Sequence, residues 1–220
     1  MTYYRFDEPS PPLTIGKLVC LARTYRKHAA EMKAEVTKDP LLFLKPASSV
    51  IFNGDTIVIP RRSTSLHHEV ELGVIIGKKA KKIAPEKALE YVRGYLVGLD
   101  ITARDLQAEA KKQGWPWSIA KGFDTFAPLS NAVDQGAVSN PNDLDLSLRV
   151  NTMIRQQSNT GNMVYPVEDI IAYVSSIMTL EPGDLIMTGT PEGVGEIHHG
   201  DILEARLSDL CMLTVDVKKE

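Results

Sequence analysis

Alternating hydrophobic and polar positions predict β-strands along much of the chain. Between residues 69 and 77 every second position is aliphatic, which is the period of a strand that turns one face toward a core. Further strands are expected at residues 17–21, 55–60, 95–100, 144–150, 153–157, 184–188, 201–207 and 212–218. Asn151 and Thr152 separate two of these strands, so they predict a hairpin turn and an antiparallel pair.

Helical patterns are fewer. They predict helices at residues 23–33, 85–93, 103–113 and 167–178. The third of these follows Thr102, has Asp105 in the position of a capping box, and ends before Gly114. Because strands outnumber helices and do not alternate with them regularly, the sequence predicts an α+β fold with a curved sheet that is mixed or mostly antiparallel.

The chain is expected to form one domain behind a short extended segment. Residues 1–16 are rich in proline and predict that extended segment, whereas residues 17–220 contain no repeat, low-complexity tract or flexible linker. The polar stretch 130–142 is interpreted as a surface loop within the domain.

Charge and composition exclude several classes of protein. The 220 residues carry 25 Lys and Arg against 28 Asp and Glu, a net charge of −3, so the basic excess of a nucleic-acid binder is missing. No stretch reaches the roughly 18 consecutive apolar residues of a membrane span, and the N-terminus lacks the basic start of a targeting signal. We therefore expect a cytoplasmic protein that binds neither nucleic acid nor membrane.

Three carboxylates form the first candidate site. Glu69 and Glu71 share one face of the strand at 69–77, and Asp100 ends the apolar strand at 95–100. Carboxylates beside a core repel one another unless a cation lies between them, and oxygen ligands suit Mg²⁺, Mn²⁺ or Ca²⁺ better than zinc. An exposed edge strand, where water screens the repulsion, is the alternative. His67 and His68 precede this strand and are interpreted as structural partners rather than ligands.

A second group of candidates lies on the helix expected at 23–33. His28 and Glu31 are three residues apart, so the carboxylate can orient the imidazole and raise its basicity. Arg23 makes the same segment cationic, which suits an anionic substrate. Both features are also compatible with a solvated helix surface.

Polar residues farther along the chain complete the candidate set. Arg104 and Gln107 share a face of the helix that starts after Asp100. Lys121 follows an aromatic stretch, and a lysine in a partly dry pocket can stabilise an enolate, although a surface lysine is the alternative. The glycine-rich turn 188–195, which includes Thr190, can hold an oxyanion but matches no nucleotide-binding loop.

Taken in order, these motifs resemble the fumarylacetoacetate hydrolase family, and within it the small single-domain acylpyruvases and oxaloacetate decarboxylases. The resemblance covers residue 17 to the C-terminus. The segments that carry it are Ala22-Arg23-Thr24-Tyr25 with His28 and Glu31, Phe43-Leu44-Lys45-Pro46, His68-Glu69-Val70-Glu71-Leu72-Gly73, Asp100-Ile101-Thr102-Ala103-Arg104-Asp105 with Gln107, Lys121, and the turn 188–195.

The resemblance implies a β-roll-like mixed fold and a homodimer. It also implies that Glu69, Glu71 and Asp100 hold Mg²⁺ or Mn²⁺ and that His28 and Glu31 lie on a lid over the ligand. The residues that it places against the substrate are Lys121, Arg104, Gln107 and Thr190.

One departure from the family pattern concerns the start of this lid. Family members commonly have Gly-Arg-Asn-Tyr where this chain has Ala22-Arg23-Thr24-Tyr25. If the glycine adopts a positive φ, Ala22 is strained in its place.

The function expected first is a divalent-metal-dependent hydrolase or lyase. It would cleave the carbon–carbon bond of acylpyruvates or decarboxylate oxaloacetate through a metal-stabilised enolate, so the partner is a small anionic 2-oxo acid or 1,3-dicarbonyl compound. In the hydrolase, His28 activates a water and Lys121 holds the departing enolate. The alternatives are an isomerase or tautomerase of oxaloacetate or of a 2-hydroxyhepta-2,4-diene-1,7-dioate-type substrate, and a metal-binding scaffold without turnover.

Overall fold

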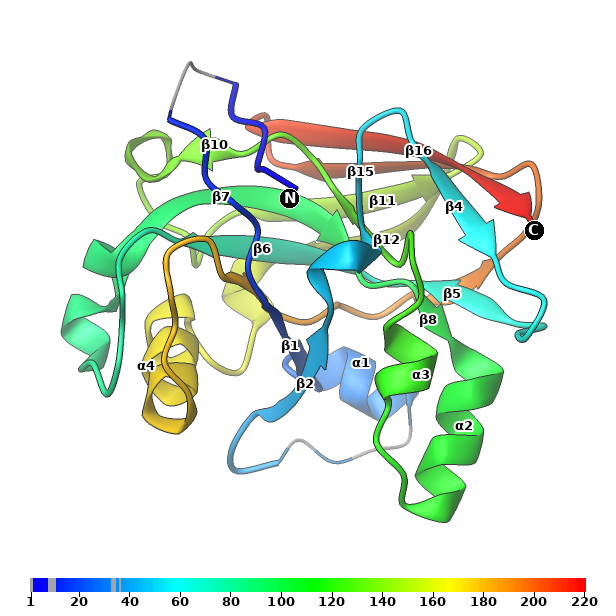
Figure 1. Ribbon diagram of the computed structural model, residues 1–220, viewed down its shortest axis with the longest axis horizontal. Helices are drawn as coiled ribbons and strands as arrows, with labels where there is room; N and C mark the ends of the chain where they lie inside the picture. Colours follow the sequence, from blue (N-terminus) through cyan, green and yellow to red (C-terminus); the bar gives the residue numbers. More distant parts are fainter. Residues whose placement is uncertain (1, 8–10, 33–34, 36) are drawn as a thin grey trace.

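The computed structural model describes residues 2–7, 11–32, 35 and 37–220, and its largest element is an eight-stranded mixed sheet (Figure 1). The strand order is β2-β1-β13-β6-β7-β9-β3, with β10 paired to β7. Parallel pairs join β1 to β13 and β3 to β9, and the other pairs are antiparallel. These strands are β1 (Leu18–Ala22), β2 (Leu41–Lys45), β3 (Val50–Phe52), β6 (Val70–Ile76), β7 (Val92–Leu99), β9 (Ala127–Leu129), β10 (Val133–Asp134) and β13 (Leu185–Met187).

Two smaller sheets complete the β structure. A five-stranded sheet has the order β12-β11-β15-β16-β4, and a three-stranded sheet has the order β14-β5-β8. Their strands are β4 (Thr56–Ile59), β5 (Leu66–His68), β8 (Thr102–Ala103), β11 (Asp145–Val150), β12 (Met153–Asn159), β14 (Gly195–Ile197), β15 (Ile202–Leu207) and β16 (Cys211–Lys219). The predicted α+β class with a mixed sheet is confirmed.

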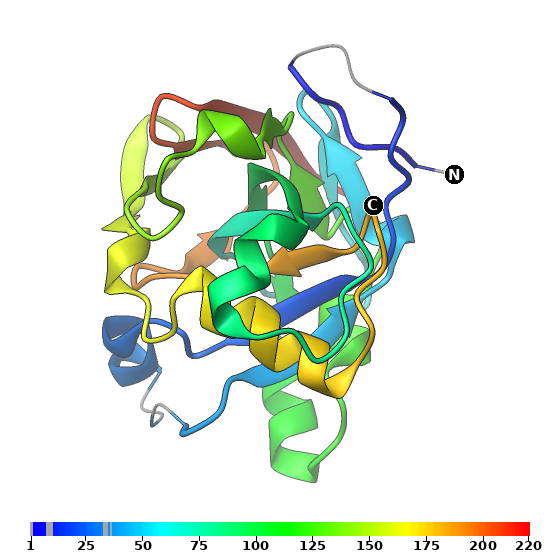
Figure 2. The ribbon, with the colours of Figure 1, turned by 90° about the vertical axis from the view of Figure 1, so that its left-hand side faces the viewer.

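The helices lie outside the sheets. In Figure 1, α1, α2 and α3 lie below the strands on one side, and Figure 2 shows α4 packed beside η2. The helices are α1 (Arg26–Glu31), α2 (Arg104–Gln113), α3 (Ser118–Lys121) and α4 (Val167–Ile177), with 3₁₀ turns η1 (Ala47–Ser49), η2 (Pro85–Tyr91), η3 (Gln135–Ala137) and η4 (Thr160–Asn162). Among the described residues, none of these helices is long and apolar enough to cross a membrane.

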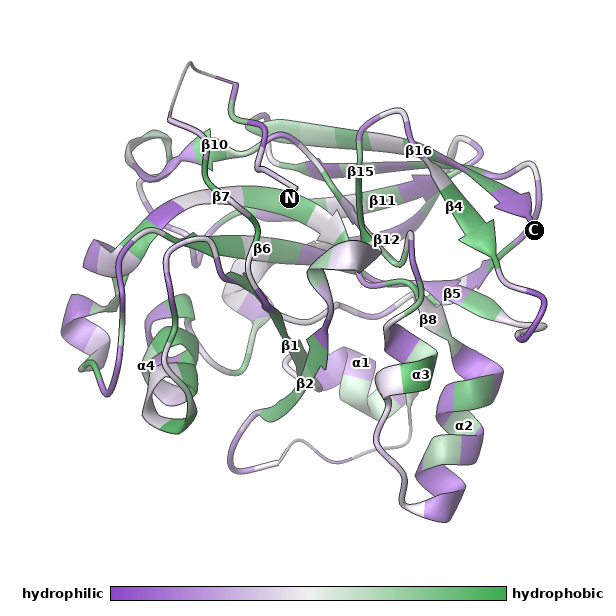
Figure 3. Cartoon of the chain, in the orientation of Figure 1, coloured by the Kyte–Doolittle hydropathy of each residue, from purple (hydrophilic) through white to green (hydrophobic). Residues whose placement is uncertain are grey.

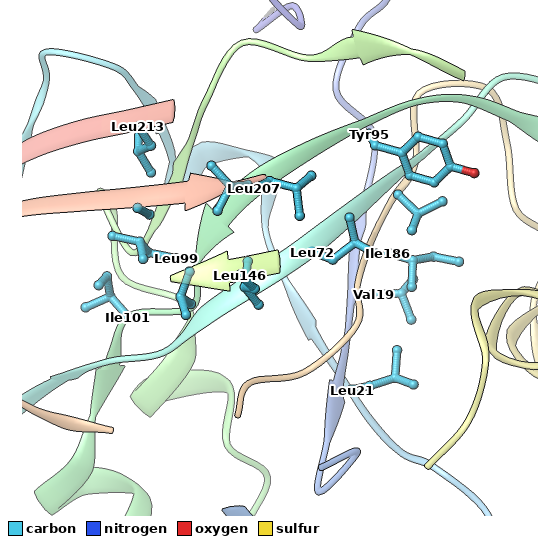
Figure 4. Packing of buried hydrophobic residues seen from close by; sticks show 14 of the residues in the cluster. Val19, Leu21, Leu72, Tyr95, Leu99, Ile101, Leu146, Ile186, Leu207 and Leu213 are labelled. Carbon is cyan, nitrogen blue, oxygen red and sulfur yellow. The ribbon is translucent and has the colours of Figure 1, made fainter. Parts of the chain in front are cut away.

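The main hydrophobic core fills the space between the two larger sheets. All seven residues of β6 are buried, and the central strands are largely hydrophobic in Figure 3, whereas α2 is mostly hydrophilic. Figure 4 shows Leu72 and Leu99 of the eight-stranded sheet in the same cluster as Leu207 and Leu213 of the five-stranded sheet. The strand expected at 69–77 is therefore present as Val70–Ile76 inside the protein, not as an exposed edge strand.

The local predictions hold for the hairpin but differ from the structure at two of the helices. Asn151 and Thr152 adopt φ of 49° and 72° between β11 and β12, as a type I′ turn requires. The first helix begins at Arg26 rather than at residue 23, and the segment expected at 85–93 is a 3₁₀ helix. Residue 33, the expected end of the first helix, lies outside the described residues.

The capping box expected at Thr102 is also wrong. The N-cap residue of α2 is Ala103, whose side chain has no polar atom. The Thr102 hydroxyl donates to the Asp100 carbonyl and does not cap the helix. Asp105 accepts from the Ser63 hydroxyl and the Thr64 backbone N–H, so it joins α2 to a neighbouring loop. Gly114 ends the helix in the left-handed conformation, as expected.

The N-terminal segment lies against the large sheet. Tyr3 bridges Thr14, and Phe6 bridges Ala132. Tyr4 is buried, and its hydroxyl donates to the Gly183 carbonyl at 3.0 Å. The described residues of this segment therefore contribute to the packing of the main domain.

Truncation of the core at Leu72 tests this packing. Leu72 is fully buried in β6, whereas Leu44 in β2 is 48% exposed. We predict that Leu72→Ala lowers the free energy of unfolding by about 2–5 kcal/mol in denaturant titrations, because it leaves a cavity. Leu44→Ala should cost less than about 1 kcal/mol. Equal losses in the two variants would contradict the assignment of the core.

Candidate active site

A cavity of about 200 Å³ opens between α1, α2, α3 and the end of the large sheet. It contains every predicted site residue except Glu31 and Asp100, and these two contact residues that line it, His28 and Lys121. The side chains around it are Leu21, Ala22, Arg23, His28, Met32, Phe43, Glu69, Glu71, Arg104, Gln107, Lys111, Trp117, Lys121 and Thr190.

Strand pairing brings the three carboxylates together. β6 and β7 are antiparallel and pair Val70 with Leu99, so the end of β7 lies beside the beginning of β6. The Asp100 N–H donates to the Glu69 carbonyl at 2.8 Å, which fixes this junction. One carboxylate oxygen each from Glu69, Glu71 and Asp100 lies within 4.8 Å of the others, and all three residues are buried. The proximity expected from the sequence is thus present.

Three cationic side chains surround the carboxylates. The Lys121 ammonium donates to Glu69 Oε2 at 2.8 Å, to Asp100 Oδ2 at 2.5 Å and to the Thr102 hydroxyl at 2.6 Å. Lys45 donates to Asp100 Oδ1 at 2.6 Å, and Arg104 donates to Glu69 Oε1 at 2.5 Å. Lys121 is buried rather than exposed, which excludes the surface-lysine alternative. All three ammonium protons of Lys121 are used within the protein.

Burial and neighbouring charges shift the pKa values of Glu69 and Glu71 in opposite directions. Burial alone raises the pKa of Glu69, but Lys121 and Arg104 outweigh it and hold that pKa well below its usual range. Burial, together with Asp100 and Glu69, raises the pKa of Glu71 well above its usual range. The pKa of Lys121 rises to about 12, since Asp100 and Glu69 outweigh burial. Its two carboxylate partners therefore favour the protonated form of Lys121, and Glu71 is the carboxylate with the least compensated charge.

These residues fit a hard divalent cation. The donor set of Glu69, Glu71 and Asp100 consists of carboxylate oxygens, which Mg²⁺ and Mn²⁺ prefer, and it contains no nitrogen or sulfur donor. Glu71 forms no ion pair with a described residue and accepts only the Gly189 N–H, at 2.8 Å. A divalent cation held by the three carboxylates would supply the positive charge that this buried carboxylate lacks.

His28 and Glu31 form the expected pair in α1. His28 is 8% exposed and lines the cavity, and its Nδ1 lies 3.3 Å from Glu31 Oε2. Glu31 accepts the Gly193 N–H at 3.2 Å, so the glycine-rich turn fixes the carboxylate. Residues 33, 34 and 36, which include part of the expected lid, lie outside the described residues.

Ala22 does not have the positive φ that would strain it. The positive φ lies one residue later, at Arg23. Ala22 is paired with Leu41 in extended conformation, whereas Arg23 has a φ of 63°. The Thr24 hydroxyl then donates to the Thr188 carbonyl at 2.7 Å. A Cβ atom on Gly189, where φ is +94°, would lie 2.0 Å from the Thr24 hydroxyl oxygen, so only glycine fits there. The departure from the family pattern therefore leaves Ala22 unstrained.

A buried network positions Thr190. Gln156 accepts the Val70 N–H at 3.1 Å and donates to the Pro191 carbonyl at 3.0 Å and to the Thr190 hydroxyl at 2.8 Å. His68 Nδ1 lies 3.0 Å from Gln156 Oε1, which is an acceptor, so Nδ1 is the protonated nitrogen. Thr190 accepts this bond and keeps its own proton for a ligand. His68 thus acts as a structural partner, as the sequence suggests.

The structure adds residues that the sequence did not single out for a role. Phe43 and Trp117 form one wall, with ring centroids 5.7 Å apart. Lys45 is buried and donates to Asp100. The sequence contained one signal for this burial, because Lys45 follows an apolar run. Lys111 lines the cavity, but nothing in the sequence distinguishes it from Lys112.

Similarity to known proteins extends over most of the chain and includes the residues of this site. Residues 17–218 match the family described as fumarylacetoacetate (FAA) hydrolase C-terminal. The chain belongs to the fumarylacetoacetate hydrolase family.

Relatives within this family carry several activities in their names. The mitochondrial oxaloacetate tautomerase of Arabidopsis thaliana is 47% identical over 92% of this chain and 91% of that protein. The mitochondrial oxaloacetate decarboxylase of Dictyostelium discoideum is 44% identical over 88% of this chain and 89% of its own length. The crystal structure of fumarylpyruvate hydrolase from Pseudomonas aeruginosa, in complex with Mn²⁺ and pyruvate, superposes with a TM-score of 0.96 at 34% identity, covering 100% of this chain and 96% of that one.

Removal of the Lys121 charge tests the charge balance in this fumarylacetoacetate hydrolase fold. We predict that Lys121→Met lowers the free energy of unfolding in EDTA by about 3 kcal/mol, because it leaves buried carboxylates uncompensated. Saturating Mg²⁺ should restore more stability in the variant than it adds to the wild type, since no ammonium competes for the carboxylates. Lys112→Met, at an exposed position, serves as the control. Equal Mg²⁺ effects in Lys121→Met and wild type would contradict this account.

Proposed function

We propose that the protein is a divalent-metal-dependent enzyme that interconverts the keto and enol forms of oxaloacetate or a closely related 2-oxo acid. The observation that carries this proposal is the position of His28, a potential base, in the cavity that Glu69 and Glu71 line, with Asp100 clustered behind them. Curated relatives named oxaloacetate tautomerase, 47% and 43% identical over 92% of the chain, favour this reaction over the cleavage expected first from the sequence.

Each side chain has a distinct part in this proposal. Glu69, Glu71 and Asp100 would hold Mg²⁺ or Mn²⁺, which polarises the keto group of the substrate when bound. His28 takes the proton from the carbon next to the keto group, and Glu31 orients the imidazole and stabilises its positive charge. The proton is then returned to the oxygen of the enolate, which completes the tautomerisation.

The remaining residues bind the anion. Lys121 stays protonated, so its role is to stabilise negative charge and not to act as a base. Arg104 and Gln107 are joined by a 2.8 Å hydrogen bond and both line the cavity, which suits a carboxylate. Thr190 offers its hydroxyl proton, and Arg23 lines the same cavity and adds positive charge.

Carbon–carbon cleavage is the second candidate. In an acylpyruvate hydrolase the same His28 deprotonates a water that attacks the distal carbonyl, and pyruvate leaves as its enolate. The similarity to fumarylpyruvate hydrolase from Pseudomonas aeruginosa supports this possibility, and the oxaloacetate decarboxylase relative supports loss of CO₂. The non-catalytic scaffold predicts no turnover at all.

An NMR time course distinguishes these functions. With Mg²⁺, we predict faster keto–enol exchange of oxaloacetate and a loss of about 100-fold or more in rate in His28→Asn, because the proton acceptor is removed. His198→Asn, at an exposed histidine, should retain the wild-type rate. Pyruvate and acetate formed from acetylpyruvate, and lost in His28→Asn, would instead establish the hydrolase. Wild-type exchange rates in His28→Asn would refute the proposed base.

Assembly, location and domain division are further proposals. The resemblance implies a homodimer, and exposed apolar side chains on β12, β15 and β16 support an interface there: Met153, Ile154, Ile202 and Met212. A cytoplasmic location and a catalytic domain at 17–220 stay predictions. Light scattering at micromolar concentration should give twice the 24.3 kDa chain mass, whereas a monomer would contradict the proposed dimer.

A further inference from the structure

Positive charge exceeds negative charge around the cavity. Five cationic side chains lie at the carboxylates or line the cavity, and three of them, Lys45, Lys121 and Arg104, form ion pairs with Glu69 or Asp100. The other two, Arg23 and Lys111, line the cavity without an ion pair to any carboxylate of the described residues. A divalent cation on the carboxylates increases this positive excess. The site is therefore electrostatically matched to a ligand with more than one negative charge.

The unpaired cations lie near one another. Arg23, Arg104 and Lys111 all line the same cavity of about 200 Å³, so their positive charges face one small space. Lys111 is exposed on α2 while it lines the cavity, so it lies at the opening. Arg104 Nε is buried without a hydrogen-bond partner among the described residues, so it remains a donor for a ligand.

An aromatic wall connects the carboxylates to this opening. Lys121 Nζ lies 4.7 Å from the Phe43 ring centroid, Phe43 contacts Trp117, and Lys111 Nζ lies 5.3 Å from the Trp117 ring centroid. The wall thus extends from Lys121, which contacts Glu69 and Asp100, to Lys111, which forms no ion pair with a described residue. A ligand along this wall meets a polar region, an apolar surface and a second cationic region in succession.

We propose that Lys111 and Arg23 form a second carboxylate subsite at the opening of the cavity, which makes the enzyme selective for dianionic 2-oxo acids. This inference rests on the proposed function and adds the substrate class. The 2-oxo acid group lies at the carboxylates Glu69, Glu71 and Asp100, and the distal carboxylate accepts hydrogen bonds from Lys111 and Arg23. These two residues determine specificity and take no part in proton transfer.

Binding of a non-reactive substrate pair tests the subsite. The pair is 3,3-difluorooxaloacetate, which has no proton at C3, and its 4-methyl ester, which keeps the 2-oxo acid but lacks the distal charge. Calorimetry in Mg²⁺ should show about tenfold or tighter binding of the dianion to the wild type, as expected for a charged hydrogen bond. This preference should decrease as salt is added.

Substitutions assign the preference to the two residues. Lys111→Gln should reduce the ratio of dianion to ester affinity by about tenfold, whereas Lys111→Arg should retain it. Arg23→Asn should also reduce the ratio, and asparagine tolerates the positive φ at this position. Lys112→Gln, at the neighbouring exposed lysine that does not line the cavity, is the matched control and should keep the wild-type ratio.

The outcomes separate the two proposals. If the wild type binds the dianion and the ester equally, or if Lys111→Gln keeps the preference, the second subsite is refuted while the 2-oxo acid site stands. If the wild type binds neither compound in Mg²⁺, the proposed function fails and the subsite fails with it. Equal turnover of oxaloacetate and its 4-methyl ester would also overturn the selectivity.

Discussion

The concentration of three carboxylates in a buried space is the constraint on which the rest of the site depends. Buried carboxylates are unfavourable unless positive charge compensates them. Lys45, Lys121 and Arg104 supply part of that charge, while Glu71 has no cationic partner among the described residues. The site thus combines carboxylates that are paired with lysines and arginine and one carboxylate whose charge a divalent cation could compensate.

The fold maintains this arrangement through backbone contacts. Antiparallel pairing of β6 with β7 places Asp100 beside Glu69, and the Gly189 N–H holds Glu71. The same glycine-rich turn contacts Thr24 and Glu31, so Glu71 and the His28–Glu31 pair share one support. A connection of this kind would keep the proposed base at a fixed position relative to the substrate.

Much of the fold was predictable from local patterns, whereas the candidate residues were joined into one site by the resemblance to the family. The strand at 69–77 was evident because its aliphatic residues alternate, and the α+β class followed from the order of elements. Lys45 and Lys111 were not assigned because their roles depend on non-local contacts: Lys45 meets Asp100, 55 residues away, and Lys111 differs from Lys112 only by its direction on α2. The cap at Thr102 failed for the same reason, since its hydroxyl bonds to Asp100 and Lys121.

The central claim is that a divalent cation binds beside His28, and paramagnetic broadening by Mn²⁺ tests it most directly. In NMR spectra of the histidine ring protons, the account predicts that the His28 signal disappears at substoichiometric Mn²⁺. The signals of the exposed His198 and His199 should persist, and Asp100→Asn should abolish the effect on His28. Persistence of the His28 signal at stoichiometric Mn²⁺, or earlier loss of the His198 and His199 signals, would contradict the account.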